Sequence, residues 1–113
     1  MRKVGLRGEE IAVSYLKDKG YNILARNWRC ERGELDIVAK DGDILVFVEV
    51  KTRRTRWHGS PAEAVDNRKR ERLRLLALNY IHQTGTSAAA YRFDVVTVEG
   101  KAEKVTLYKN AFS

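Results

Sequence analysis

Residues 33–51, GELDIVAKDGDILVFVEVK, contain two apolar runs on either side of a short polar turn. Strand-forming residues fill 35–40 and 44–51, and Asp41-Gly42 between them is a strong signal for a two-residue hairpin turn. The second run is apolar on both faces as far as Glu49, which is typical of a central strand. We therefore predict a β-hairpin at the centre of the fold.

The turn also predicts the register of the hairpin. With two turn residues, Lys40 pairs with Asp43, and side chains then alternate between the two faces of the sheet. In this register Asp36, Glu49 and Lys51 project from the same face. Asp36 and Glu49 become diagonal neighbours, with backbones about 7–8 Å apart.

Two carboxylates on one face of a largely apolar hairpin repel each other and resist desolvation. A divalent cation between Asp36 and Glu49 would remove this repulsion, since Mg²⁺ commonly takes one or two carboxylates plus waters and phosphate oxygens. Lys51 would then lie where it can orient or deprotonate an attacking water, or stabilise charge on a phosphate. The opposing interpretation is an exposed strand end, because Glu-x-Lys is a common pattern.

N-terminal to the hairpin, residues 5–19 have the pattern of a helix that Gly20 ends. On a helical wheel Glu9 lies about 60° from the apolar Ala12, and Glu10 about 160° away. Glu9 is therefore expected to face the protein, where it could hold the metal or one of its waters, and Glu10 to face solvent.

C-terminal to the hairpin, a second helix is predicted, with Ser60 as N-cap, Pro61 at its first position and Glu63 completing a capping box. Gly85 ends it. Its apolar stripe, extended backward, reaches Lys69, which either approaches a bound phosphate or extends past the helix edge to solvent.

Further strands are expected at 21–28, 91–99 and 103–108, the last two joined near Gly100. The predicted order is α-β-β-β-α-β-β, which favours an α/β fold with a mixed sheet and helices packed against it. We find no linker or repeat in the 113 residues and expect a single domain over 1–113.

The net charge of +7 is concentrated in residues 51–74, where nine basic and three acidic residues give +6. Such a segment attracts polyanions, although a solvated basic helix is the simpler interpretation and an anionic membrane a weaker one. The candidate nucleic-acid-binding residues are Arg53, Arg54, Arg56, Lys69 and Arg72.

The single cysteine, Cys30, excludes an internal disulfide and a cysteine-only zinc site. No apolar run approaches the roughly 20 residues of a membrane span, and no signal-peptide core follows the basic start. A cytoplasmic location is expected.

Four other residues could contribute to the site, and three of them have a second interpretation. Trp57 could stack on an unpaired base or pack against the protein, and His58 could assist catalysis or be solvated. Asp94 interrupts an apolar strand and could support the site from behind. Glu34 could be an extra carboxylate of the site or could face solvent.

Several motifs resemble the YraN-like family of small, largely uncharacterised bacterial proteins, over essentially the whole chain. They are Gly8-Glu9, Asn27-Trp28, Gly33-Glu34-Leu35-Asp36, Val46-Phe47-Val48-Glu49-Val50-Lys51-Thr52-Arg53 and Arg92-Phe93-Asp94-Val95-Val96. That family is in turn similar to archaeal Holliday-junction resolvases and to restriction-endonuclease-like nucleases.

The resemblance implies a restriction-endonuclease-like fold and a site that uses an acid, an Asp and an (Asp/Glu)-x-Lys pair with Mg²⁺. By position, Glu9 matches the helical acid, Asp36 and Glu49 the metal ligands, and Lys51 the catalytic lysine. Leu35 stands where the wider superfamily often has proline. Because proline is not a ligand, this departure does not imply loss of activity.

The leading hypothesis is a Mg²⁺- or Mn²⁺-dependent endonuclease that cleaves phosphodiester bonds in DNA, with branched or structured DNA as one candidate substrate. The alternative is a non-catalytic nucleic-acid-binding module on a nuclease scaffold. A third is an assembly protein whose basic helix meets an acidic partner. Cutting a four-way junction symmetrically needs two sites, so a homodimer stays open.

Overall fold

The computed structural model describes residues 3–53 and 65–112. The elements, in order, are α1 (Lys3–Asp18), β1 (Asn22–Cys30), β2 (Gly33–Asp41), β3 (Ile44–Arg53), α2 (Asn67–Thr84), β4 (Ala90–Glu99) and β5 (Lys104–Phe112). The predicted order and the α/β class with a mixed sheet are confirmed. In the part of the chain that the structure describes, no helix is both long and apolar enough to cross a membrane.

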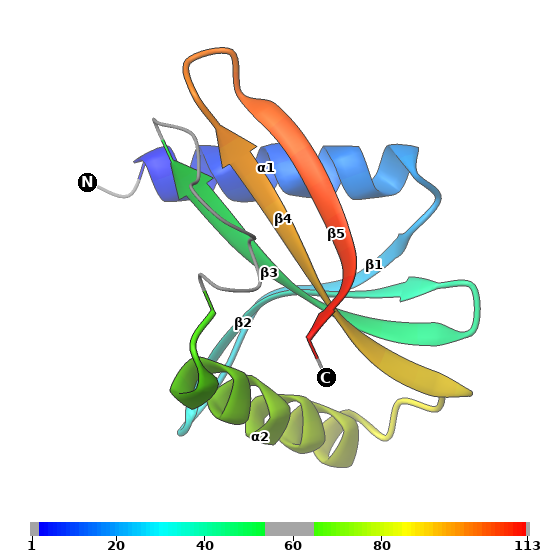
Figure 1. Ribbon diagram of the computed structural model, residues 1–113. Helices are drawn as coiled ribbons and strands as arrows, with labels where there is room; N and C mark the ends of the chain where they lie inside the picture. Colours follow the sequence, from blue (N-terminus) through cyan, green and yellow to red (C-terminus); the bar gives the residue numbers. More distant parts are fainter. Residues whose placement is uncertain (1–2, 54–64, 113) are drawn as a thin grey trace.

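The five strands form one sheet in the order β1-β2-β3-β4-β5. The first three strands are antiparallel neighbours, β4 runs parallel to β3, and β5 is antiparallel to β4. Parallel neighbours need a long crossover, and α2 lies in the connection between β3 and β4. The two helices lie on opposite faces of the sheet (Figure 1).

The hairpin of β2 and β3 forms, but its register differs from the expected one. Asp41 pairs with Ile44, so the two turn residues are Gly42 and Asp43, and Lys40 pairs with Leu45. Gly42 has a φ of 63°, and a glycine with positive φ at the first turn position is the type II′ arrangement. The expected pairing of Lys40 with Asp43 is therefore wrong by two positions. An even shift leaves every side chain on its predicted face.

Helix α2 begins later than expected. Asp66 is its N-cap, with an extended backbone (φ −71°, ψ 173°) and a side chain that accepts a hydrogen bond from the Lys69 N–H at 2.9 Å. The prediction of a helix that runs on without a break from Pro61 is wrong, because Asp66 is not helical. The expected cap residues Ser60, Pro61 and Glu63 lie outside the described residues.

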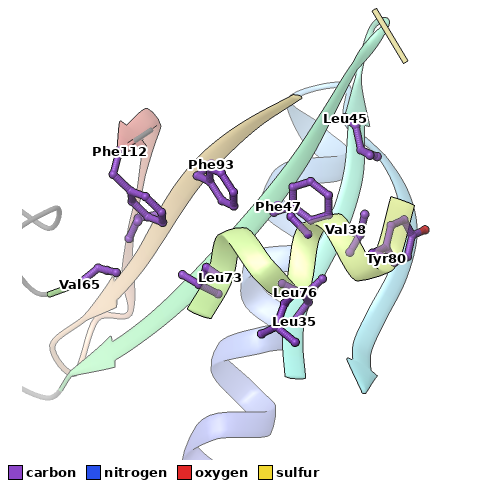
Figure 2. Close-up of a cluster of buried hydrophobic side chains, with 12 residues drawn as sticks. Leu35, Val38, Leu45, Phe47, Val65, Leu73, Leu76, Tyr80, Phe93 and Phe112 are labelled. Carbon is purple, nitrogen blue, oxygen red and sulfur yellow. The ribbon is translucent and has the colours of Figure 1, made fainter. Parts of the chain in front are cut away.

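Two apolar clusters hold the helices to the sheet, one on each face. Figure 2 shows the cluster under α2, where Leu73, Leu76 and Tyr80 of the helix pack on Phe47 and Phe93. The cluster under α1 consists of Ala12, Val13, Leu16, Tyr21, Ile37, Ala39, Val46, Val48, Val96 and Val98. Since β3 contributes to both clusters, its prediction as a central strand is confirmed.

Strand β5 extends four residues beyond its expected end at Tyr108. The pairing of β4 and β5 is interrupted by an irregularity between Phe93 and Val95, and Asn110 adopts a φ of 53° there. Beyond it, Phe112 stacks on Phe93 with ring centroids 5.0 Å apart. The contact between Phe93 and Phe112 therefore accompanies the renewed pairing of β5 with β4 beyond the irregularity, which the sequence pattern does not predict.

Candidate active site

The candidate site lies where β2 and β3 separate. The two strands pair from Asp41–Ile44 as far as Ile37–Val48. Beyond that point, residues 33–35 continue to pair with β1 and residues 49–53 with β4. In Figure 1 the end of β3 runs beside β4 toward α1, whereas β1 and β2 turn toward α2. The sheet therefore opens directly after Val48.

Asp36 lies at this opening. One further step of the register would place Asp36 opposite Glu49 rather than diagonal to it. The Val50 N–H, which has no β2 carbonyl to pair with, donates instead to Asp36 Oδ2 at 2.9 Å. By alternation, Glu49 lies on the same face as Phe47, which is the α2 face.

Glu49 is buried, with 6% of its surface exposed, and two lysines reach it. Lys51 Nζ and Lys69 Nζ each lie 3.3 Å from the same oxygen, Glu49 Oε2. Lys51 comes from the same strand and Lys69 from the first turn of α2. The Lys69 ammonium group therefore lies at Glu49, and its approach to a bound phosphate stays a prediction.

The environment of Asp36 opposes its ionisation. Burial of the carboxyl raises its pKa most, and the negative charges of Glu49 and Glu9 raise it further. The Val50 N–H and the Lys69 charge act in the opposite direction, and the resulting pKa is about 7. Burial and the neighbouring carboxylates therefore outweigh the Val50 N–H and the charge of Lys69.

Glu9 is delivered to the site by close packing of α1 on β3. A Cβ on Gly8 would fall well inside the contact distance of Thr52 Oγ1 and 3.4 Å from Thr52 Cβ, so only glycine lets the helix come this near. Glu9 Oε1 is buried and has no hydrogen-bond partner among the described residues. Glu10 is exposed, so the predicted difference between the two glutamates is confirmed.

These residues fit a divalent cation. A buried carboxylate oxygen without a donor is costly unless something positive approaches it. Among the described residues no three His, Cys, Asp or Glu side chains are grouped closely enough to form a complete metal cage. Mg²⁺ does not require one, because it commonly binds through one or two carboxylates and keeps several waters. Asp36 and Glu49 would be these ligands, with Glu9 behind them.

The remaining predicted residues are distributed around this centre. Arg53 is exposed at the end of β3, and Arg72 is exposed on α2, with its side chain beside Gly33. Glu34 lies 3.6 Å from Arg29 across the β1–β2 pair, in a surface ion pair. Arg54, Arg56, Trp57 and His58 lie outside the described residues.

Asp94 does not support the site. Its fully buried carboxylate accepts hydrogen bonds from Tyr21 Oη, the Arg92 guanidinium and the Asn110 N–H, at 2.8–2.9 Å. Tyr21 belongs to the α1 face, opposite Glu49. The suggestion that Asp94 backs the carboxylates is therefore wrong, because it is enclosed by its own donors.

Two groups of the site were not identified from the sequence, the Val50 N–H and Gly8. The first depends on where two strands separate, which no local pattern encodes. The second does have a signal, since a glycine inside a helix lowers its stability and so points to a packing or functional reason.

Comparison with known proteins agrees with the predicted relationship. The sequence profile of an uncharacterised protein family, UPF0102, matches residues 8–98. A UPF0102 protein of Pelotomaculum thermopropionicum is 45% identical over 113 residues, covering 96% of this chain and 94% of the relative. One from Symbiobacterium thermophilum is 47% identical over 114 residues, covering 98% and 97%. The predicted YraN-like relationship is confirmed, and the relatives' names assign no activity.

Replacing Asp36 by Asn should stabilise the metal-free protein at neutral pH. When folding raises the pKa of an acid, the acid does not lower the stability of the protein at a pH below its unfolded pKa of about 4, because it is protonated in both states. Stability then falls as pH rises toward about 7, because only the unfolded chain ionises freely. Asp36→Asn removes this cost, so its gain should grow to about 2–4 kcal/mol by pH 8. Urea unfolding in a chelator from pH 4 to pH 8 measures it, and a pH-independent difference would contradict it.

Replacing Gly8 by Ala should destabilise the protein by about 1–3 kcal/mol, although alanine favours helices, because the new methyl group overlaps Thr52. The matched control is Thr52→Ala, which removes the overlapping oxygen. In that background the cost of Gly8→Ala should largely disappear in a double-mutant cycle of urea unfolding. Equal costs in both backgrounds would show that this contact does not set the position of α1.

Proposed function

This chain belongs to the uncharacterised protein family UPF0102, and we propose that it is a Mg²⁺- or Mn²⁺-dependent endonuclease that hydrolyses phosphodiester bonds in DNA. The observation that carries the proposal is the grouping of Asp36, Glu49, Lys51 and Lys69 where β2 and β3 separate. A buried acid and a partly buried one beside two lysines, in a basic protein, suit a reaction on a phosphate ester with a metal ion.

Asp36 and Glu49 would hold the ion, and Glu9 would hold it or one of its waters. When bound, the ion supplies charge that polarises a phosphate oxygen and lowers the pKa of a coordinated water. Asp36 must give up its proton to serve as a ligand. Burial is the largest cause of the high pKa of this carboxyl, about 7, and the charge of Glu49 is the next, so a bound cation would favour its ionised form.

The two lysines would act on the nucleophile and on the phosphate. In the hydrolysis, a water oxygen bonds to phosphorus and one ester P–O bond breaks. The departing oxygen takes a proton, and the products are a phosphate monoester and an alcohol. Lys51, next to Glu49 on the same strand, would orient the attacking water. Lys69, from the helix above, would bind a non-bridging phosphate oxygen and stabilise its growing charge.

DNA is the proposed substrate because of the charge distribution. The segment 51–74, which carries +6, includes Lys51 and the first turns of α2, so the basic surface borders the site itself. Branched or structured DNA, and the homodimer that symmetric cutting of a junction would require, extend this proposal.

A second candidate is a DNA-binding module that has the scaffold without the reaction. The observation in its favour is that Lys51 and Lys69 already contact Glu49, so part of the site's negative charge is neutralised without a metal ion. Such a protein would bind DNA in the absence of divalent cations and leave it intact.

A cleavage panel tests the two candidates against each other. Labelled four-way junction, flap, duplex and single-stranded DNA are incubated with Mg²⁺ or Mn²⁺ and the native protein, Lys51→Ala or Asp36→Asn. At least one substrate should be cut, and each variant should lower the rate by at least about 100-fold. Lys17→Ala, an exposed lysine of α1, is the control and should cut normally. Binding of every substrate with no cutting would favour the binding module.

Metal binding is tested without activity by thermal unfolding. Mn²⁺ should raise the unfolding temperature of the native protein, because an ion bound at ten times its Kd adds about 1.4 kcal/mol of stability. Asp36→Asn and Glu49→Gln should lose most of this shift, whereas Asp18→Asn, exposed at the end of α1, should keep it. The same shift in all four proteins would place the ion elsewhere.

A further inference from the structure

A second polar site lies at the other end of α2. A cleft of about 380 Å³ opens between this helix and the β1–β2 turn. Its lining consists of Arg29, Cys30, Glu31, Arg32, Asn79 and Gln83. None of these residues belongs to the candidate active site, and two arginines face a single glutamate.

One side of α2 connects this cleft to the carboxylates. Lys69, Arg72, Asn79 and Gln83 fall within an arc of about 80° of the helix, at 100° per residue. Lys69 contacts Glu49, the Arg72 side chain lies beside Gly33, and Asn79 and Gln83 line the cleft. The 14 residue steps from Lys69 to Gln83 correspond to about 21 Å along the helix.

The groups in the cleft are chemically suited to a phosphodiester backbone. Arginine guanidinium groups bind phosphate oxygens in a bidentate manner, and side-chain amides donate to them. Arg29 pairs with Glu34 only at 3.6 Å, and 76% of its side chain is exposed. An ion pair of this kind is weak and screened by solvent, so a phosphate can replace it.

We propose that this cleft is a second backbone-phosphate subsite for the DNA on which the candidate active site acts. The inference rests on the proposed function, because it takes the same strand to lie at Glu49. At about 3.4 Å of helix axis per nucleotide, 21 Å is about six nucleotides. The DNA strand therefore runs along α2, with a phosphate about six nucleotides from the scissile one held by Arg29 and Arg32.

The test compares Arg29→Gln/Arg32→Gln with Lys101→Gln/Lys104→Gln. The control removes the same charge from exposed residues at the β4–β5 turn, at the opposite end of the molecule from α2 (Figure 1). Affinity for labelled duplex DNA is measured by anisotropy from 50 to 300 mM salt in a chelator, which prevents cutting. Loss of the one backbone phosphate that the two arginines hold should lower the slope of log K against log salt by about 1. The control should keep the native slope.

DNA length gives a second readout. Native protein should lose affinity when the duplex on one side of the bound centre falls below about six nucleotides, and Arg29→Gln/Arg32→Gln should be insensitive to this change. Equal slopes and equal length dependence in the cleft variant and the control would overturn the subsite and leave the proposed function standing. If the native protein binds no DNA at all, the proposed function fails, and this inference fails with it.

Discussion

The meeting of a buried acid, Glu49, with a partly buried one, Asp36, where β2 and β3 separate is the constraint that organises this molecule. Asp36 and Glu49 cannot both be ionised there cheaply, and each neighbouring element supplies something to that point. Helix α2 brings Lys69, the end of β3 brings Lys51, and α1 brings a third acid, Glu9. The two helices lie on opposite faces, yet both contribute to one site because the sheet is open between them (Figure 1). The fold is arranged around a local electrostatic cost, which is the pattern expected of a functional site.

The buried polar groups at the other end of the sheet show the contrast. Arg92 pairs with Asp94 and Asp41, and Tyr21 donates to Asp94, so each charge in that network meets an opposite charge or a donor. Such a network fixes the relative positions of β2, β4 and the start of β1. At the candidate active site, by comparison, Glu9 Oε1 has no partner within the part of the chain that the structure describes. This difference is the reason why we propose a ligand at the second place and not at the first.

The sequence predicted the faces of the sheet better than its register. Side chains alternate between the two faces of a strand. A change of two positions in the pairing of β2 with β3 therefore leaves Asp36, Glu49 and Lys51 on the faces that the sequence predicts. The choice between Asp41-Gly42 and Gly42-Asp43 depends on which turn position the positive φ of Gly42 serves, and both fit the same letters. The start of α2 was missed for a related reason, because Asp66 is as good an N-cap as Ser60 and only packing decides between them. The role of Asp94 depended on long-range contacts with Tyr21 and Asn110, which no local pattern reveals.

The position of both lysines on one oxygen of Glu49 has a consequence for the order of events in the proposed enzyme. Lys51 and Lys69 act as counter-ions of Glu49, so the fold does not depend on a divalent cation to balance this charge. The same two ammonium groups shield the Glu49 carboxylate for as long as they stay in contact with it. In the proposed enzyme, a bound phosphate would attract the ammonium groups of Lys51 and Lys69. Glu49 Oε2 would then be free to bind a cation. Ion and nucleic acid then favour each other's binding by an equal factor, as thermodynamic linkage demands. Each would bind more tightly in the presence of the other, so the site would be filled most completely when DNA and the ion are both present.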